Sequence, residues 1–189
     1  MVSTGMVSAI CVDWSKKEIL LVYNNDPEKP QNSWGLPGGK MKAGETSEAA
    51  ALRELGQETN QEGRITKYRV EIQKNGPRGE YIHNIFFVKI VSDGKELKNN
   101  EDPKAIPRRI PFQVIFSGKV KIFPSHVQGL ILILEKMSEQ KNLNQGKVDR
   151  NGILIMSEGP SALLEILNEL KNAFDAKGKY IISFYRRSR

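Results

Sequence analysis

Two glutamates, Glu54 and Glu58, stand four residues apart in a segment rich in alanine and leucine. On a helix that spacing places both carboxylates on one face, one turn apart, where they can bind the same hard divalent cation. A pair of glycines, Gly38 and Gly39, precedes this segment. Because glycine has no Cβ, such a turn can bring backbone groups close to a metal ion or a phosphate. These residue types therefore indicate metal-assisted chemistry on a phosphate compound.

Three further residues belong to the same constellation. Glu45 at the entrance of the helix can pair with Arg53, eight residues later, and fix the loop against the helix. Gln57 lies on the helix face that carries the two glutamates. An amide oxygen can bind a hard cation but brings no charge, so we expect at least one metal position to be weakened.

The stretch GKMKAGETSEAAALRELGQETNQ, residues 39–61, resembles the Nudix box, and the preceding WGLPGG resembles the usual lead-in of that family. The positions that match at the required spacing are Gly39, Glu45, Arg53, Glu54, Leu55 and Glu58. Three positions depart from it: Gln57 replaces a glutamate, Asn60 a glycine and Gln61 an aliphatic residue. Asparagine tolerates the left-handed backbone that often ends a helix, so Asn60 is a mild change.

The resemblance implies an α/β/α sandwich with a mixed sheet, and hydrolysis of a diphosphate bond in a nucleoside diphosphate linked to another moiety. It implies Mg²⁺ or Mn²⁺ as the cofactor. Position by position, it makes Glu54 and Glu58 the catalytic metal ligands, the carbonyl of Gly38 a further ligand, and Glu45 and Arg53 organisers of the loop. We keep Gln57 as a weaker metal ligand, because its amide oxygen remains a hard donor.

Residues outside the box are expected to complete the site. A second carboxylate from a loop often does so, and the long segment 92–111 offers Glu101 or Asp102. Basic side chains that can meet the phosphates are Lys40, Lys42, Arg108 and Arg109. His83 and His126 have no Cys or His nearby at metal spacing, so we interpret both as structural or surface residues.

Two functions stay open at this point. The first is a divalent-metal-dependent pyrophosphohydrolase acting on a small nucleoside diphosphate derivative. The second is a catalytically weak Nudix-fold module that binds nucleotide or RNA through basic residues and the terminal FYRRSR. We favour the small molecule over nucleic acid, and metal-dependent turnover separates the two.

The elements that must position these residues alternate between strand and helix patterns, which predicts an α/β fold. Strands are expected at 6–14 and 18–25, at 67–73 and 80–91 as a long hairpin, and at 112–116 and 118–123, with 92–111 as a loop. A helix should begin at Thr46 or Ser47 and end near Asn60, and a second should span 125–137.

The C-terminal part follows a different pattern. We expect a Nudix domain at 1–138, a polar linker at 139–150 and a βαβ-like extension at 151–189, with a helix at 159–174 between strands at 152–157 and 179–187. About 40 residues cannot bury much surface alone. The extension should therefore pack on the main domain or on a partner subunit, which leaves a homodimer open.

Composition excludes some classes of protein. The chain has 189 residues, 39% of them hydrophobic, and its longest apolar run is far too short to cross a bilayer, so no membrane partner is expected. The net charge of +7 suits an anionic partner without identifying it. The single cysteine, Cys11, lies in an apolar run and reads as a core residue. With no recognisable export signal, we expect a cytoplasmic protein.

Overall fold

The computed structural model describes residues 5–24, 33–76, 79–91, 96–100, 105–144 and 160–174. The elements in chain order are β1 (Met6–Ile10), β2 (Val12–Asp13), β3 (Glu18–Asn24), β4 (Ser33–Gly35), β5 (Gly38–Lys40), α1 (Ser47–Thr59), β6 (Gly63–Gly76), β7 (Gly79–Ile90), β8 (Ile106–Pro111), α2 (Phe112–Phe116), β9 (Lys121–Ile122), α3 (Pro124–Asn144) and α4 (Pro160–Ala173).

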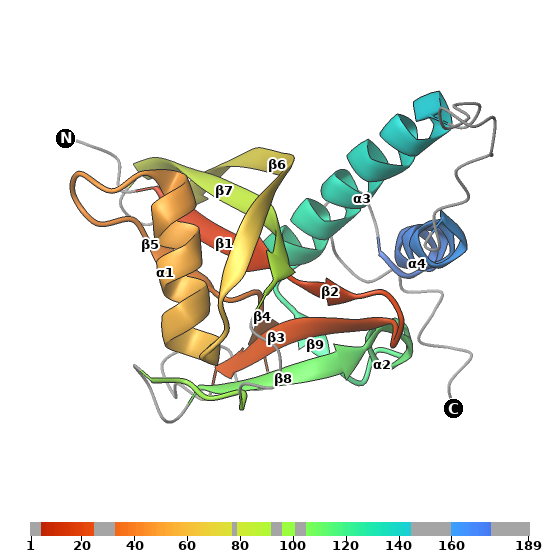
Figure 1. The fold of residues 1–189 in the computed structure, drawn as a ribbon, viewed down its shortest axis with the longest axis horizontal. Coiled ribbons are helices and arrows are strands. Elements are labelled where there is room, and N and C mark those ends of the chain that lie inside the picture. Colours follow the sequence, from red (N-terminus) through yellow and green to blue (C-terminus); the bar gives the residue numbers. More distant parts are fainter. Residues whose placement is uncertain are drawn as a thin grey trace.

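The strands form two mixed sheets. One has the order β5-β1-β7-β6, and the other has the order β2-β3-β4-β9 with β8 paired to β3. The β1–β7 and β4–β9 pairs are parallel and the remaining pairs are antiparallel. Helix α1 lies on one side of the strands, and α3 and α4 lie on the other side (Figure 1). This arrangement confirms the predicted α/β class with a mixed sheet.

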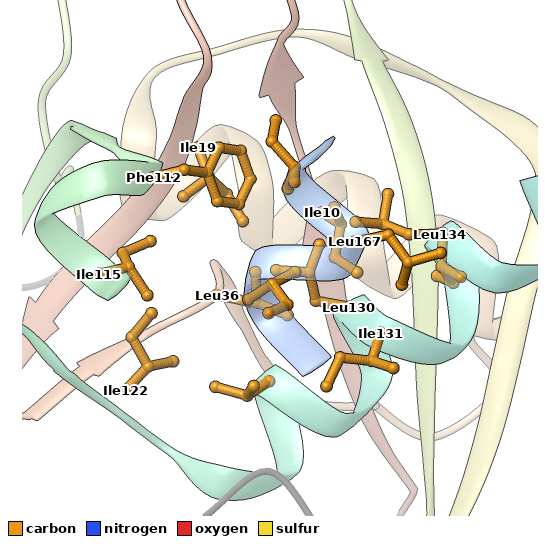
Figure 2. Close-up of a cluster of buried hydrophobic side chains, with 14 of the residues drawn as sticks. Ile10, Ile19, Leu36, Phe112, Ile115, Ile122, Leu130, Ile131, Leu134 and Leu167 are labelled. Atoms are coloured by element: carbon orange, nitrogen blue, oxygen red, sulfur yellow. The ribbon is translucent and has the colours of Figure 1, made fainter. Parts of the chain in front are cut away.

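The central strands are buried on both faces, which is why their sequences are apolar at consecutive positions. Val7 and Ala9 of β1 belong to a core cluster beneath α1, which contributes Ala51 and Leu55. Ile10 belongs to a larger cluster on the opposite face. Figure 2 shows part of that cluster, in which strand residues meet α2, α3 and α4; the labelled side chains are Ile10, Ile19, Leu36, Phe112, Ile115, Ile122, Leu130, Ile131, Leu134 and Leu167.

Helix α1 begins and ends where the sequence predicts. The hydroxyl of Thr46 accepts a hydrogen bond from the amide of Ala49 at 3.2 Å and caps the first turn. Asn60 adopts a left-handed conformation with φ 58° and donates its amide to the carbonyl of Gly56 at 2.9 Å. The Asn60 departure therefore leaves the helix end intact.

Two predictions between residues 92 and 116 are wrong. The end of the predicted loop is strand β8, whose prolines are tolerated because its one neighbour among the described residues is β3. The predicted strand 112–116 is helix α2, in which Phe112 and Ile115 are buried while Gln113 is exposed. A short apolar run cannot distinguish a strand from a buried helical turn by periodicity alone.

The C-terminal part contains the predicted helix. α3 runs to Asn144 instead of ending near Met137, because no glycine or proline lies between these two residues, and the first part of the predicted linker is thus helical. α4 confirms the helix expected at 159–174, and its buried leucines belong to the main core cluster. The strands expected at 152–157 and 179–187 lie outside the described residues, and the domain division and the homodimer stay predictions.

Ion pairs also join α4 to the rest of the protein. Lys17 contacts Glu165 at 2.7 Å, and Lys171 contacts Glu135 of α3 at 2.7 Å. In the part of the chain that the structure describes, no helix is long and apolar enough to span a bilayer.

Candidate metal and diphosphate site

The chain bends at Pro37, and Gly38 and Gly39 then begin strand β5, which is pressed against strand β1. This bend and the two glycines are called the Gly38–Gly39 turn below. In the β1–β5 ladder Gly38 stands opposite Ser8 and Gly39 opposite Val7. A Cβ added to Gly38 would lie 2.1 Å from the carbonyl oxygen of Val7 and 2.5 Å from the hydroxyl of Ser8. Only glycine fits at this position, because any side chain would push β5 away from β1.

The same turn is joined to the front of α1. A Cβ on Gly39 would lie 2.5 and 2.8 Å from the two carboxylate oxygens of Glu54, which is 7% exposed. The amide of Gly38 donates to Oε2 of Glu58 at 2.8 Å. The fold therefore brings together Gly38 and Glu58, twenty residues apart in the sequence, and Gly39 and Glu54, fifteen apart, in one site.

Arg53 fastens the loop to the helix as predicted. Its Nε donates to Oε1 of Glu45 at 2.8 Å and its Nη2 to Oε2 at 3.0 Å, a two-point contact between planar groups. Nη2 also donates to the carbonyl of Lys40 at 3.1 Å, and the amide of Lys42 donates to Glu45 at 3.0 Å. The hydrogen bonds from Arg53, and then that from Lys42, lower the pKa of Glu45 to about 2.

The remaining guanidinium nitrogen of Arg53 contacts two residues of the helix front. Nη1 donates to Oε1 of Glu54 and to Oε1 of Gln57, both at 2.8 Å. The amide oxygen that we expected to bind metal is thus the acceptor for Arg53. Gln57 helps to hold the guanidinium beside Glu54, and its role as a metal ligand stays a prediction.

The residues present fit a divalent cation such as Mg²⁺. Among the described residues, no three His, Cys, Asp or Glu side chains converge in a group that could hold a metal ion. Mg²⁺ is commonly bound by one or two carboxylates together with water and substrate phosphates, so Glu54 and Glu58 suffice as its protein carboxylates. The absence of a Cβ at Gly39 is what allows the Glu54 carboxylate to lie against the turn.

The structure separates the basic residues that were expected to meet phosphates. The side chains of Lys40 and Lys42 are exposed, while their main chains hold the loop. Arg108 stands opposite Leu21 and Arg109 opposite Leu20, so the strand directs them to opposite faces. Of these two arginines, Arg109 lies on the face of the sheet that is turned toward α1, because its partner Leu20 belongs to the core cluster beneath that helix. Glu101 and Asp102 lie outside the described residues.

Cys11 is confirmed as a core residue. It is 1% exposed, and burial raises the pKa of its thiol to about 12. A thiol held in its protonated form is not a nucleophile at neutral pH.

Sequence reasoning missed a pair of histidines next to the turn. The rings of His83 and His126 are 5.4 Å apart. The amide of Leu36 donates to Nδ1 of His126 at 2.8 Å, and the Ser8 hydroxyl is hydrogen-bonded to Nε2 of His83 at 2.9 Å. These contacts join residues 90 and 75 positions apart, and no local sequence pattern predicts such pairs.

Among curated proteins, the chain is similar to an ADP-ribose pyrophosphatase. The ADP-ribose pyrophosphatase of Methanocaldococcus jannaschii is 33% identical over 98 residues, which are 49% of this chain and 54% of that protein. The chain thus spans about half the length of this curated relative.

Solved structures share the fold. The E. coli ORF135 protein superimposes with a TM-score of 0.52 at 18% identity, covering 76% of this chain and 94% of that one. A bifunctional NMN adenylyltransferase/ADP ribose pyrophosphatase from Francisella tularensis gives 0.54 at 24% identity, covering 71% of this chain and 41% of that one.

The NUDIX domain family matches residues 4–121, well over half of the 189 residues, and the matched range contains the glycine turn, the Arg53 contacts and both helix carboxylates. This chain belongs to the Nudix family.

Proposed function

We propose that this protein hydrolyses a diphosphate bond in a nucleoside diphosphate derivative, with Mg²⁺ or Mn²⁺ as its cofactor. One observation carries the proposal: the carboxylates of Glu54 and Glu58 both contact the Gly38–Gly39 turn, one through close packing and the other through a 2.8 Å hydrogen bond. Hard oxygen donors are what a divalent cation requires, and the bound cation would in turn hold the oxygens of a diphosphate.

The protein's own residues supply position and charge. Glu54 and Glu58 would hold the cation, and Gly38 through its carbonyl is the further ligand we propose. When bound, the metal would neutralise the diphosphate and lower the pKa of an attacking water. Arg53 keeps the Glu54 carboxylate in place through the 2.8 Å contact from Nη1, while Glu45 holds the other edge of the guanidinium. Arg109, on the α1 face of its sheet, is the basic side chain we assign to the phosphates.

The similarity to the M. jannaschii ADP-ribose pyrophosphatase supports a nucleoside diphosphate sugar as the substrate class. ADP-ribose is therefore the first compound to test, followed by other NDP-sugars, dinucleoside polyphosphates and nucleoside triphosphates. Each should be incubated with Mg²⁺ and with Mn²⁺. We expect metal-dependent release from at least one of them by the wild-type protein and a loss of at least about 100-fold in Glu58→Gln. Equal release by both proteins would exclude the proposed site.

A second function is favoured by Gln57. Its oxygen accepts from Arg53 and adds no charge, so the site has fewer anionic donors than the family pattern supplies. A binding module that retains nucleotide without hydrolysis would show affinity for ADP-ribose or RNA in the presence of EDTA and no turnover of any compound in the panel. Turnover above the Glu58→Gln control would exclude this second function.

A further inference from the structure

The backbone of the segment 36–38 is held by three different elements. The amide of Leu36 donates to Nδ1 of His126 at 2.8 Å, and the carbonyl of Pro37 accepts from the amide of Ala9 at 2.8 Å. The amide of Gly38 donates to Glu58 at 2.8 Å. The position of the Gly38–Gly39 turn is therefore set jointly by α3, β1 and α1. Of these contacts, only that of His126 comes from outside the Nudix box and the strand that pairs with it.

His126 is fixed on the chain that leads into the turn. It lies in the first turn of α3, and a Cβ on Gly35 would be 3.2 Å from its Cε1 and 3.3 Å from its Nδ1. Just before it, the amide of Phe123 donates to the carbonyl of Trp34 at 3.1 Å. The start of α3 thus holds the segment on both sides of Gly35, so a movement of α3 would be transmitted to the turn.

His83 supports the same turn from β7. Its Nε2 is hydrogen-bonded to the hydroxyl of Ser8 at 2.9 Å, and Ser8 stands directly opposite Gly38 in the β1–β5 ladder. Its ring meets the ring of His126 edge to face, with centroids 5.4 Å apart. The two histidines, His83 buried and His126 half-buried, therefore form one layer that contacts the turn at Leu36 and, through Ser8, at Gly38.

The contact with Leu36 fixes the chemical form of His126. Nδ1 can accept a hydrogen bond only if it carries no proton, so the ring must be neutral with its proton on Nε2. Burial, and then the neighbouring His83 and Lys74, lowers the pKa of His126 to about 3. The neutral ring is thus the form present at physiological pH.

We propose that His126 is a positioning residue for the reaction: by accepting the Leu36 amide it holds the Gly38–Gly39 turn in the place where Glu54 and Glu58 meet it. The inference rests on the proposed function, because it assumes that this turn is the metal site. The hydrogen bond of His126 goes to Leu36, two residues before Gly38, so His126 acts on the turn through Leu36.

Two substitutions separate positioning from general stability. His126→Asn keeps an acceptor oxygen close to the position of Nδ1, whereas His126→Leu has similar bulk and no acceptor. We expect His126→Leu to raise the Mg²⁺ concentration for half-maximal turnover about tenfold and to lower kcat, and His126→Asn to stay within about threefold of the wild type. Ile133→Val, a core change in the same helix, is the control and should leave the half-saturation unchanged. A His126→Leu protein with wild-type Mg²⁺ half-saturation, or equal impairment of both His126 variants, would overturn the inference.

Two measurements keep this test independent of turnover and of folding. The Mn²⁺ affinity, measured by electron paramagnetic resonance in the absence of substrate, should be lowered in His126→Leu and should stay close to that of the wild type in His126→Asn and Ile133→Val. If no compound is hydrolysed, the proposed function fails, while the Mn²⁺ affinities still decide the role of His126. In the wild-type protein at neutral pH, NMR should detect a nitrogen–nitrogen coupling between the Leu36 amide and Nδ1 of His126. An absent coupling, or a protonated Nδ1, would refute the inference even if His126→Leu does not fold.

Discussion

Replacing Gly39 by alanine should damage the site while leaving the fold almost intact. The new Cβ would lie 2.5 Å from Oε1 of Glu54, about 0.9 Å short of the 3.4 Å at which ordinary van der Waals contact begins. The atoms that must move are the end of a side chain, and an off-rotamer shift of this kind costs only about 1 kcal/mol of stability. A displacement of about 1 Å in a catalytic group can cost about 100-fold in rate. We therefore expect turnover to fall about 100-fold and Mn²⁺ affinity to fall with it.

Gly56→Ala is the matched control for this substitution. Gly56 lies in α1, two residues from Glu54, and an added Cβ would have Gln61 O at 3.8 Å as its nearest neighbour. Alanine in a helix interior should raise the free energy of unfolding by about 1 kcal/mol and leave turnover unchanged. Steady-state kinetics with an Mg²⁺ titration, together with urea unfolding of both variants, makes the comparison. If Gly39→Ala retains wild-type kcat and Mg²⁺ half-saturation, the Glu54 carboxylate has no part in the reaction.

Further predictions concern charge, acidity and the core. Gln57→Glu should tighten Mn²⁺ binding about tenfold, because a +2 and a −1 charge roughly 6 Å apart in water attract each other by about 1.4 kcal/mol. A Mn²⁺ affinity equal to that of the wild type, measured by electron paramagnetic resonance, would contradict this. Arg53→Lys removes the two-point contact with its carboxylate partner and should lower the free energy of unfolding by about 1 to 3 kcal/mol; a stability equal to that of the wild type would show the contact to be unimportant. The unfolding free energy should be highest above pH 6.5 and fall on acidification. In the folded protein the pKa is about 4 for His83 and about 3 for His126, so below pH 6.5 the unfolded histidines, with the ordinary pKa of 6.5, bind more protons than the folded ones. Measured by urea unfolding between pH 6.5 and 5, this free energy should fall by up to about 1.4 kcal/mol per pH unit for each histidine. A free energy that does not change with pH would argue against neutral histidine rings in the folded protein. Leu170→Ala should cost about 2 to 5 kcal/mol within a single unfolding transition, since Leu170 is 0% exposed in the main core; a separate transition for α4 would contradict a shared core.

The parts of the fold that could be predicted from the sequence depend on local physics. The ends of α1 follow from the Thr46 cap and the left-handed Asn60, both encoded within a few residues. The Glu45–Arg53 contact is predictable for the same reason, because a loop and the helix it precedes cannot separate far.

Contacts between distant segments could not be predicted in this way. The Leu36–His126 hydrogen bond joins residues 90 positions apart, and neither residue has a local feature that indicates a partner. The prolines and charges of β8 predict a loop, and it is the pairing with β3 that makes this segment a strand.

Gln57 illustrates a third limit of sequence reasoning. Its amide oxygen is suited to a metal ion and equally suited to a guanidinium. Arg53 stands four residues before Gln57 and is its neighbour on a helix, but this spacing does not decide which of the two partners the oxygen binds. The structure places Arg53 Nη1 at 2.8 Å from that oxygen. The missing charge thus alters the surroundings of Arg53 as well as the anionic character of the site.

The most direct test of the central claim is the release of AMP from ADP-ribose in the presence of Mg²⁺, measured for the wild-type protein and for Glu58→Gln. We expect release by the wild-type protein that stops on addition of EDTA, and almost none by the variant. Release that persists in EDTA, or that is equal in both proteins, would contradict a metal site built from the Gly38–Gly39 turn and the front of α1.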